Sequence, residues 1–183
     1  MKIACLLADG FEDIEALGTV AILRRSGIQV DLVSALNTPT VTGAFKITVT
    51  PDQMMNEISD KNYDGILIPG GSAVKIMRET PAVLKLIMAI AAKKKLLAAI
   101  CAGPSLLGML GLLDGVQYTS FPSTEVFMPK GIRMAMPSVI SGNIVTGAGA
   151  GCVMEFAYDI ITVAFGKATA EDIKKRMLYR VYE

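Results

Sequence analysis

Short runs of hydrophobic residues alternate along this chain with longer segments in which hydrophobic positions recur every three or four residues. The short runs predict buried strands, and the recurring positions predict helices. Strands are expected at residues 2–7, 29–34, 66–68, 96–100 and 144–146, and helices at 12–25, 82–92, 105–113, 153–165 and 170–182. A hairpin or a pair of edge strands is expected at 41–50, where Gly43 interrupts the pattern.

The alternation of strands with helices predicts an α/β fold with a mainly parallel sheet and helices on both faces. The run at 96–100 is continuously apolar and is bounded by charged or polar residues, which is typical of a central parallel strand. No repeat, low-complexity segment or linker interrupts the 183 residues. Residues 1–183 are therefore expected to form one domain.

Ligands of open α/β sheets bind beyond the carboxyl ends of the strands, and four segments of this sequence are expected to meet there. They are residues 9–15, 69–71, 100–102 and 147–151. The glycine-rich segment 147–151 has the outline of a nucleotide-binding loop. It lacks the G-x-G-x-x-G spacing, and no Lys-Ser or Lys-Thr pair follows it, so nucleotide binding is not expected.

Cys101 is the strongest single candidate for chemistry. It lies between a predicted buried strand and a predicted helix, flanked by the small residues Ala99, Ala102 and Gly103, as a nucleophile elbow requires. A thiol at a helix N-terminus is expected to have a lowered pKa, because the positive end of the helix dipole favours the thiolate. The alternative is a structural cysteine that packs in the core as a small hydrophobic residue.

Composition excludes several classes of function. The chain has no histidine, which rules out Ser-His-Asp and Cys-His catalysis and histidine-ligated metal sites, so proteolysis is not expected. Lysine and arginine number 18 against 17 acidic residues, and this balance gives no electrostatic basis for binding nucleic acid or a charged membrane surface. No metal site is expected.

Three cysteines, Cys5, Cys101 and Cys152, are widely spaced and odd in number. They predict a reducing compartment rather than a disulfide framework, with Cys5 in the core. The first residues do not resemble a signal peptide, and no apolar stretch approaches the length of a membrane span. We therefore expect a cytoplasmic protein.

Three motifs resemble the ThiJ/PfpI superfamily, and specifically its DJ-one branch. They are GFEDIEA at 10–16, DGILIPGG at 64–71 and AAICAGP at 98–104, with a similar closing segment around 149–157. The resemblance extends over nearly the whole chain in the family's order and spacing. It implies a flavodoxin-like three-layer sandwich, a homodimer and no cofactor.

The resemblance also implies the site. Cys101 would be the reactive elbow cysteine, and Glu15 a protonated glutamate in contact with it. The backbone amides of Gly71 and Ala102, with Gly70 beside them, would form a nest for an oxyanion or an oxidised sulfur. The pocket would be lined by Phe121, where the family has a histidine, by Ala148, where it often has an arginine, and by Ala150. The residues alone leave a second reading of Glu15 open, as a solvated carboxylate that compensates the dipole of a helix start.

Two classes of function follow from the resemblance. In the first, Cys101 and Glu15 act on methylglyoxal-type α-oxoaldehydes or on glycated proteins, as a glyoxalase or deglycase without a cofactor. In the second, oxidation of Cys101 switches a non-catalytic sensor of oxidative stress or a redox-regulated chaperone. The absence of histidine favours the second class or slow catalysis.

Overall fold

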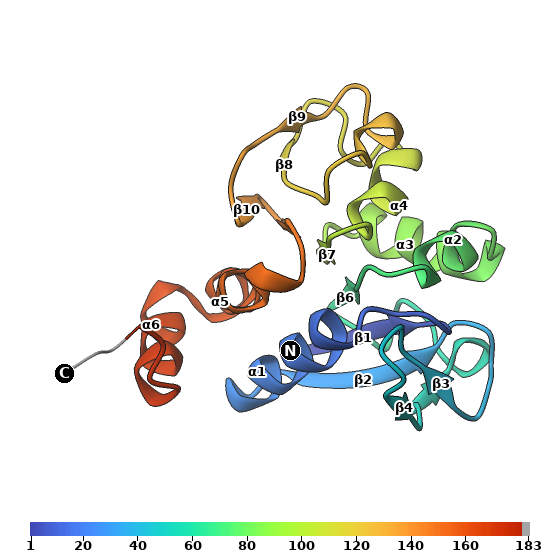
Figure 1. Cartoon of the computed structure of the whole chain (residues 1–183), viewed down its shortest axis with the longest axis horizontal. Coiled ribbons are helices and arrows are strands. Elements are labelled where there is room, and N and C mark those ends of the chain that lie inside the picture. The colour runs from blue at the N-terminus through green and yellow to red at the C-terminus, as the bar shows by residue number, and fades with distance from the viewer. Residues whose placement is uncertain (181–183) are drawn as a thin grey trace.

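A computed structural model of the chain describes residues 1–180, and at its centre is a seven-stranded sheet (Figure 1). In sheet order, the strands are β10 (Ser138–Ser141), β11 (Ile144–Gly147), β7 (Leu96–Ile100), β6 (Gly65–Ile68), β1 (Lys2–Leu7), β2 (Gln29–Ser34) and β5 (Gln53–Met54). Every neighbouring pair is parallel except β10 and β11. The expected α/β fold with a mainly parallel sheet is confirmed.

Helices cover both faces of this sheet. They are α1 (Thr19–Arg25), α2 (Ala73–Arg78), α3 (Pro81–Ala92), α4 (Pro104–Met109), α5 (Val153–Phe165) and α6 (Lys167–Arg176). α1 packs against α5, and α5 also contacts β10, β11 and α6, whereas α3 contacts β6 and β7. Figure 1 shows α1 and α5 on the opposite side of the strands from α3. This is a flavodoxin-like sandwich of three layers.

Two smaller sheets and four short helical turns complete the described residues. The sheets pair β3 (Val41–Thr42) with β4 (Thr48–Val49), and β8 (Gln117–Tyr118) with β9 (Ile132–Arg133). The turns are a π-helix at Ile14–Gly18 and 3-10 helices at Met55–Glu57, Glu125–Phe127 and Ala150–Cys152. β3 and β4 confirm the hairpin expected at 41–50. No helix within residues 1–180 is both long and apolar enough to span a membrane.

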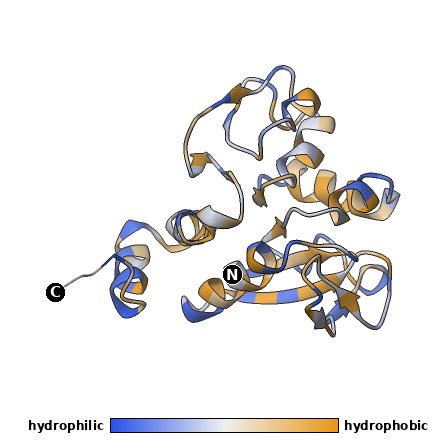
Figure 2. Cartoon of the chain, in the orientation of Figure 1, coloured by the Kyte–Doolittle hydropathy of each residue, from blue (hydrophilic) through white to orange (hydrophobic). Residues whose placement is uncertain are grey.

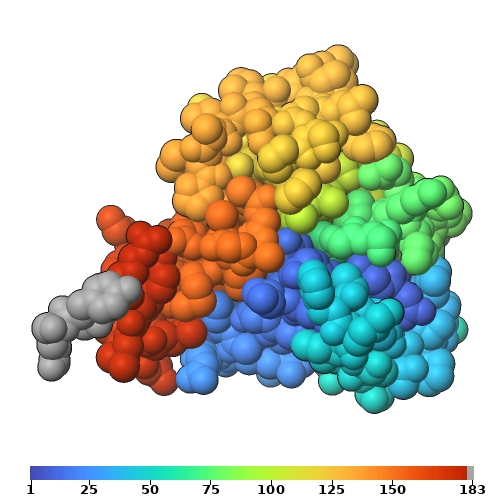
Figure 3. Space-filling model, viewed as in Figure 1, coloured from blue at the N-terminus to red at the C-terminus, as the bar shows by residue number. Residues whose placement is uncertain are grey.

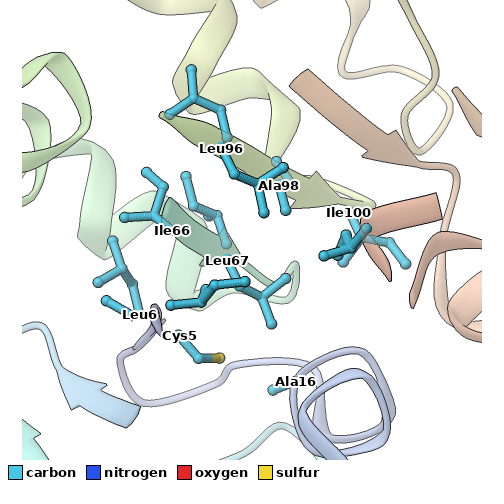
Figure 4. Close-up of a cluster of buried hydrophobic side chains, with 14 of the residues drawn as sticks. Cys5, Leu6, Ala16, Ile66, Leu67, Leu96, Ala98 and Ile100 are labelled. Carbon is cyan, nitrogen blue, oxygen red and sulfur yellow. The ribbon is translucent and has the colours of Figure 1, made fainter. Parts of the chain in front are cut away.

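The central strands supply the core. Every residue of β6 and β7 is buried, as two-sided coverage of a parallel sheet requires. Cys5 is fully buried among these side chains (Figure 4), which confirms its expected place in the core. Figure 2 shows hydrophobic residues along the strands, and a largely hydrophilic α6 at the edge of the molecule.

Several expected elements differ from the structure at their ends. The helix expected at 105–113 ends at Met109, since Gly111 has a left-handed φ of 72°. The helix expected at 170–182 begins at Lys167 and ends at Arg176, and Leu178 follows with φ 53°. The end of that expected helix lies outside the described residues.

α2, the two-residue edge strand β5 and β10 were not expected at their positions from the sequence. α2 is too short for its hydrophobic periodicity to be visible, and β10 lies in a region where three prolines interrupt the pattern. The helix expected at 12–25 is also divided, because a π-helical turn precedes α1.

Candidate active site

Cys101 lies on a sharp turn between β7 and α4. Its φ is 62°, a left-handed conformation that non-glycine residues rarely adopt. Its N–H donates to the carbonyl of Gly147 at 2.9 Å, which fixes the turn against the end of β11. A Cβ at Gly103 would lie 2.5 Å from the carbonyl oxygen of Ile68, so only glycine allows this helix to start so close to the sheet. The geometry is that of a nucleophile elbow, with the thiol half-buried.

Glu15 reaches the same place from the π-helical turn. Its side chain is buried, with 1% exposure, whereas the preceding residue Ile14 is 59% exposed. A π-helical turn is wider than an α-helical one and is frequent at functional sites, because it changes which side chains face inward. The reading of Glu15 as a solvated helix-start carboxylate is therefore wrong.

Glu15 and Cys101 meet at Gly70. The N–H of Gly70 donates to Oε2 of Glu15 at 2.8 Å. A Cβ on Gly70 would lie 2.6 Å from that same oxygen and 2.9 Å from the Sγ atom of Cys101. The carboxyl and the thiol lie close enough for each to shift the pKa of the other. The structure thus brings Glu15 and Cys101 together beside Gly70, which has no side chain to separate them.

Burial changes the acidity of both groups. It raises the pKa of Glu15 to about 7, against the opposing hydrogen bonds from the Gly70 amide and the Cys101 thiol. Burial, followed by the charge of the Glu15 carboxylate and its hydrogen bond, raises the pKa of the Cys101 thiol to about 12. The expectation of a lowered thiol pKa is therefore wrong, because desolvation and a neighbouring carboxylate outweigh the dipole of a six-residue helix.

One proton is consequently shared by the pair over a wide pH range. Between the pKa of Glu15 near 7 and the pKa of Cys101 near 12, the two groups together carry one proton and one negative charge. A thiolate forms when this proton lies on Glu15, which then donates a hydrogen bond to the sulfur. Transfer of this one proton therefore provides both a nucleophile, the Cys101 thiolate, and an acid, the protonated Glu15.

Two backbone amides also face the sulfur. The N–H groups of Gly71 and Ala102 both lower the pKa of the Cys101 thiol against the effect of burial. Gly71 has φ 85°, and a Cβ there would lie 2.2 Å from the carbonyl of Gly10, so the position requires glycine. The amide of Gly70, which was expected to be part of this nest, instead donates a hydrogen bond to Glu15.

Phe121 lies next to the elbow, where its N–H donates to the carbonyl of Cys101 at 2.9 Å. Its ring is 51% exposed, and its Cδ2 atom would lie 3.8 Å from a Cβ on Gly149. Ala148 and Ala150, on either side of Gly149, are half-buried. These three apolar residues therefore come from two loops that meet beside Cys101.

Asp13 is a buried carboxylate that the sequence analysis missed. Its side chain is 3% exposed and accepts hydrogen bonds from the amides of Phe45 at 2.8 Å and Ile47 at 3.1 Å. These bonds hold the β3–β4 hairpin against the segment that carries Glu15. No signal in the sequence links these positions, since the contact is made only by the folded chain.

Within residues 1–180, no group of three or more histidine, cysteine, aspartate or glutamate side chains is arranged to hold a metal ion. The polar groups gathered around Cys101 are its thiol, the carboxyl group of Glu15 and backbone amides.

Comparison with known proteins agrees with this arrangement. The model of the DJ-1/PfpI family matches residues 1–163. The chain belongs to the DJ-1/PfpI family. The DJ-1 homolog A of Arabidopsis thaliana is 32% identical over 95% of this chain, which spans only 45% of that longer protein. The Parkinson disease protein 7 homolog of Danio rerio is 29% identical over 96% of this chain and 95% of its own length.

Other DJ-1/PfpI relatives carry names that state an activity. A glutathione-independent glyoxalase of Caenorhabditis elegans is 28% identical over 90% of this chain and 88% of its own. A deglycase of Pyrococcus abyssi is 31% identical over 68% of this chain and 75% of its own. Among solved structures, oxidised DJ-1 from Toxoplasma gondii is 31% identical, covers 98% of both chains and has a TM-score of 0.92.

Proposed function

We propose that this DJ-1/PfpI protein converts methylglyoxal-type α-oxoaldehydes to hydroxy acids, or removes their adducts from glycated proteins, through Cys101 and Glu15 and without a cofactor. The observation that carries the proposal is the contact of the buried Glu15 carboxyl with the Cys101 thiol beside Gly70. A soft nucleophile and a group that gives and takes protons near neutral pH are the two functions this chemistry needs.

The first step is addition to the aldehyde. With the shared proton on Glu15, the Cys101 thiolate attacks the aldehyde carbon, a C–S bond forms, and the C=O electron pair moves to oxygen. Glu15 gives its proton to that oxygen, so that the product is a neutral hemithioacetal and an ionised Glu15. The pKa of Glu15 near 7 suits it to both donating and accepting this proton.

The second step is rearrangement. Ionised Glu15 removes the proton from the carbon that carries sulfur, which gives an enediolate. The hydroxyl proton on that carbon passes to the former ketone oxygen, and Glu15 returns its own proton to the neighbouring carbon. The result is a thioester of a 2-hydroxy acid on Cys101. Water then cleaves the C–S bond, which releases lactate from methylglyoxal and restores the thiol. No electron is exchanged with an external group, so that no redox cofactor is required.

Two relatives support the substrate class, since one is named a glyoxalase and another a deglycase. Phe121 supports the choice of an aldehyde over a peptide. A peptide bond has a poor leaving group that must be protonated, and the phenyl ring in the place of the family's histidine offers no proton. An aldehyde has no leaving group to expel.

The proposal predicts that purified protein forms lactate from methylglyoxal and that Cys101→Ser reduces the rate to that of buffer alone. Lactate would be quantified by proton NMR, with a peptide substrate in a parallel assay that is expected to stay uncleaved. Cys152→Ser is the matched control, because Cys152 is also half-buried but begins a different helix, and it should keep the activity. Equal lactate formation by wild type and Cys101→Ser would refute the proposal.

A second function is favoured by the two backbone amides, of Gly71 and Ala102, that lower the pKa of the Cys101 thiol. Such donors stabilise an oxidised, negatively charged sulfur as well as a thiolate. With hydrogen peroxide as the oxidant, the thiolate takes one oxygen atom and releases hydroxide, and a second peroxide gives the sulfinic acid. Stoichiometric sulfinic acid on Cys101 by mass spectrometry, without any lactate formation, would make a redox sensor or redox-regulated chaperone the better assignment.

We also propose that the protein is a homodimer, assembled through an apolar patch of Ile14, Phe45 and Ile47. These side chains are 59%, 72% and 49% exposed. Asp13 binds the amides of the two hairpin residues, so that both lie beside Ile14. Figure 3 shows the hairpin, in cyan, on the visible face of the molecule.

Phe45→Glu is expected to shift the protein from dimer to monomer in sedimentation velocity, because a charge on an apolar interface is left without a partner. Val126→Glu is the matched control, since Val126 is 74% exposed in a different segment and should leave the dimer intact. A wild-type protein that sediments as a monomer at all concentrations would contradict this assignment.

A further inference from the structure

We propose that Arg78 is a positioning residue for Cys101: its guanidinium holds together two short helices, α2 and α4, which begin just after the two backbone amides that face the sulfur. The inference rests on Cys101 being the reactive group of the proposed function. Its evidence is a chain of contacts that begins at the far end of α2 and returns to the elbow.

α2 and α4 start at the two amides. Gly71 precedes α2, and its carbonyl accepts the N–H of Val74 in the first turn of that helix. Ala102 precedes α4 in the same way, and its carbonyl accepts the N–H of Ser105 at 3.1 Å. Any movement of one helix against the other therefore changes the distance between the two amides that converge on the sulfur.

Arg78 joins these helices. It is the last residue of α2, and its Nη2 donates to Oγ of Ser105 at 3.1 Å. Ser105 is fully buried, and its hydroxyl donates in turn to the carbonyl of Ala102 at 2.6 Å. A continuous path of two hydrogen bonds thus leads from the end of α2 to the residue that follows Cys101.

The surroundings of Arg78 are unusual for a cation. Its guanidinium stacks on the ring of Phe127 at 3.8 Å, and its Nε is buried without a hydrogen-bond partner. Among the carboxylates of residues 1–180, none forms an ion pair with it. A half-buried charge without a counter-ion has a desolvation cost that apolar packing would avoid. Its planar fork and stacking instead fix one geometry.

Arg78 acts by positioning the two helices rather than through the electrostatic effect of its charge on Cys101. The groups that shift the pKa of Cys101 are burial, Glu15 and the two amides, and Arg78 is not among them. Loss of the Arg78 contact should weaken the amide bonds to sulfur, which disfavours the thiolate. The measurable consequence is slower alkylation of Cys101 and an alkylation profile displaced to higher pH.

The test is the rate of alkylation of the folded protein by iodoacetamide as a function of pH, in a Cys152→Ser background. Arg78→Met keeps the aliphatic stem and removes the fork, and we expect alkylation to slow by about tenfold. Ser105→Ala removes the other end of the contact and should slow alkylation to a similar extent. The double variant should be no slower than either single variant, because both changes break one path. Lys75→Met is the matched control, an exposed cation on the same helix, and should alkylate at the wild-type rate.

A structural role alone would lower the melting temperature without displacing the pH profile. If Arg78→Met does not fold, Ser105→Ala and Arg78→Lys carry the test, and Arg78→Lys is expected to alkylate at an intermediate rate. Wild-type rates in these variants, or additive effects in the double variant, would overturn the inference. Since alkylation requires no turnover, a protein that lacks lactate formation yet shows these effects would refute the proposed function alone.

Discussion

Glu15→Gln is expected to lower the turnover of methylglyoxal by about 100- to 10,000-fold while Cys101 remains as reactive toward iodoacetamide as in wild type, or more so. Glutamine occupies the same volume but cannot take the proton from the hemithioacetal carbon. The variant also lacks the carboxylate charge that, after burial, raises the pKa of the Cys101 thiol, so the thiolate becomes easier to form. Initial rates of lactate formation and of alkylation, measured on the same preparations, separate the two effects.

The pH dependence supplies an independent readout. Turnover by wild type should rise with pH through about 7, where the carboxyl of Glu15 loses its proton and the pair acquires its single negative charge. Glu15→Gln should lack this rise. Glu12→Gln is the matched control, because the charge of Glu12 raises the pKa of Glu15 and its removal should move the rise to lower pH with turnover retained. Wild-type turnover by Glu15→Gln would remove Glu15 from the mechanism.

Gly70→Ala is expected to lower turnover by about 100-fold or more, because the added methyl group fills the space in which the Glu15 and Cys101 side chains meet. Its Cβ would lie 2.6 Å from Oε2 of Glu15, 2.7 Å from the Cβ of Cys101 and 2.9 Å from Sγ. At these separations the side chains must move apart, and the shared proton loses its path. Lactate formation and the pH profile of alkylation measure the consequence.

Gly151→Ala is the control for this substitution. A Cβ at Gly151 meets nothing within 4 Å, and its backbone conformation is open to alanine. The variant should keep wild-type turnover, although it lies in the glycine-rich segment beside the site. Equal activities of the two variants would show that the contact at Gly70 is dispensable.

The strands and longer helices of this protein could be predicted because burial leaves a periodic trace in the sequence. β1, β2, β7 and α5 have the bounds that the hydrophobic pattern predicts. The π-helical turn that carries Glu15 could not be predicted, because the hydrophobic positions of residues 12–25 recur at α-helical spacing, although Ile14 is exposed in the structure and Glu15 is buried. α2 and its terminal Arg78 were missed for a related reason, since six residues make less than two turns.

The residues of the site could be named from motifs, but their acidity could not. The dipole of α4 pointed to an acidic thiol, yet the pKa of Cys101 depends mainly on burial and on a carboxyl group that arrives from a distant part of the chain. The same holds for Glu15, whose exposure of 1% is set by a turn that the sequence does not reveal. Desolvation is a property of the folded surroundings and is not encoded in neighbouring residues.

The φ of 62° at Cys101 implies a trade-off between durability and chemistry. A left-handed backbone costs a residue with a side chain about 1–2 kcal/mol relative to the right-handed region, and glycine escapes most of this cost. Selection for a long-lived fold alone would therefore favour glycine at this position. A cysteine at this position therefore lowers the free energy of unfolding relative to the same fold with glycine there. Variants selected for thermal resistance alone should accordingly accumulate substitutions of Cys101 that remove its reactivity.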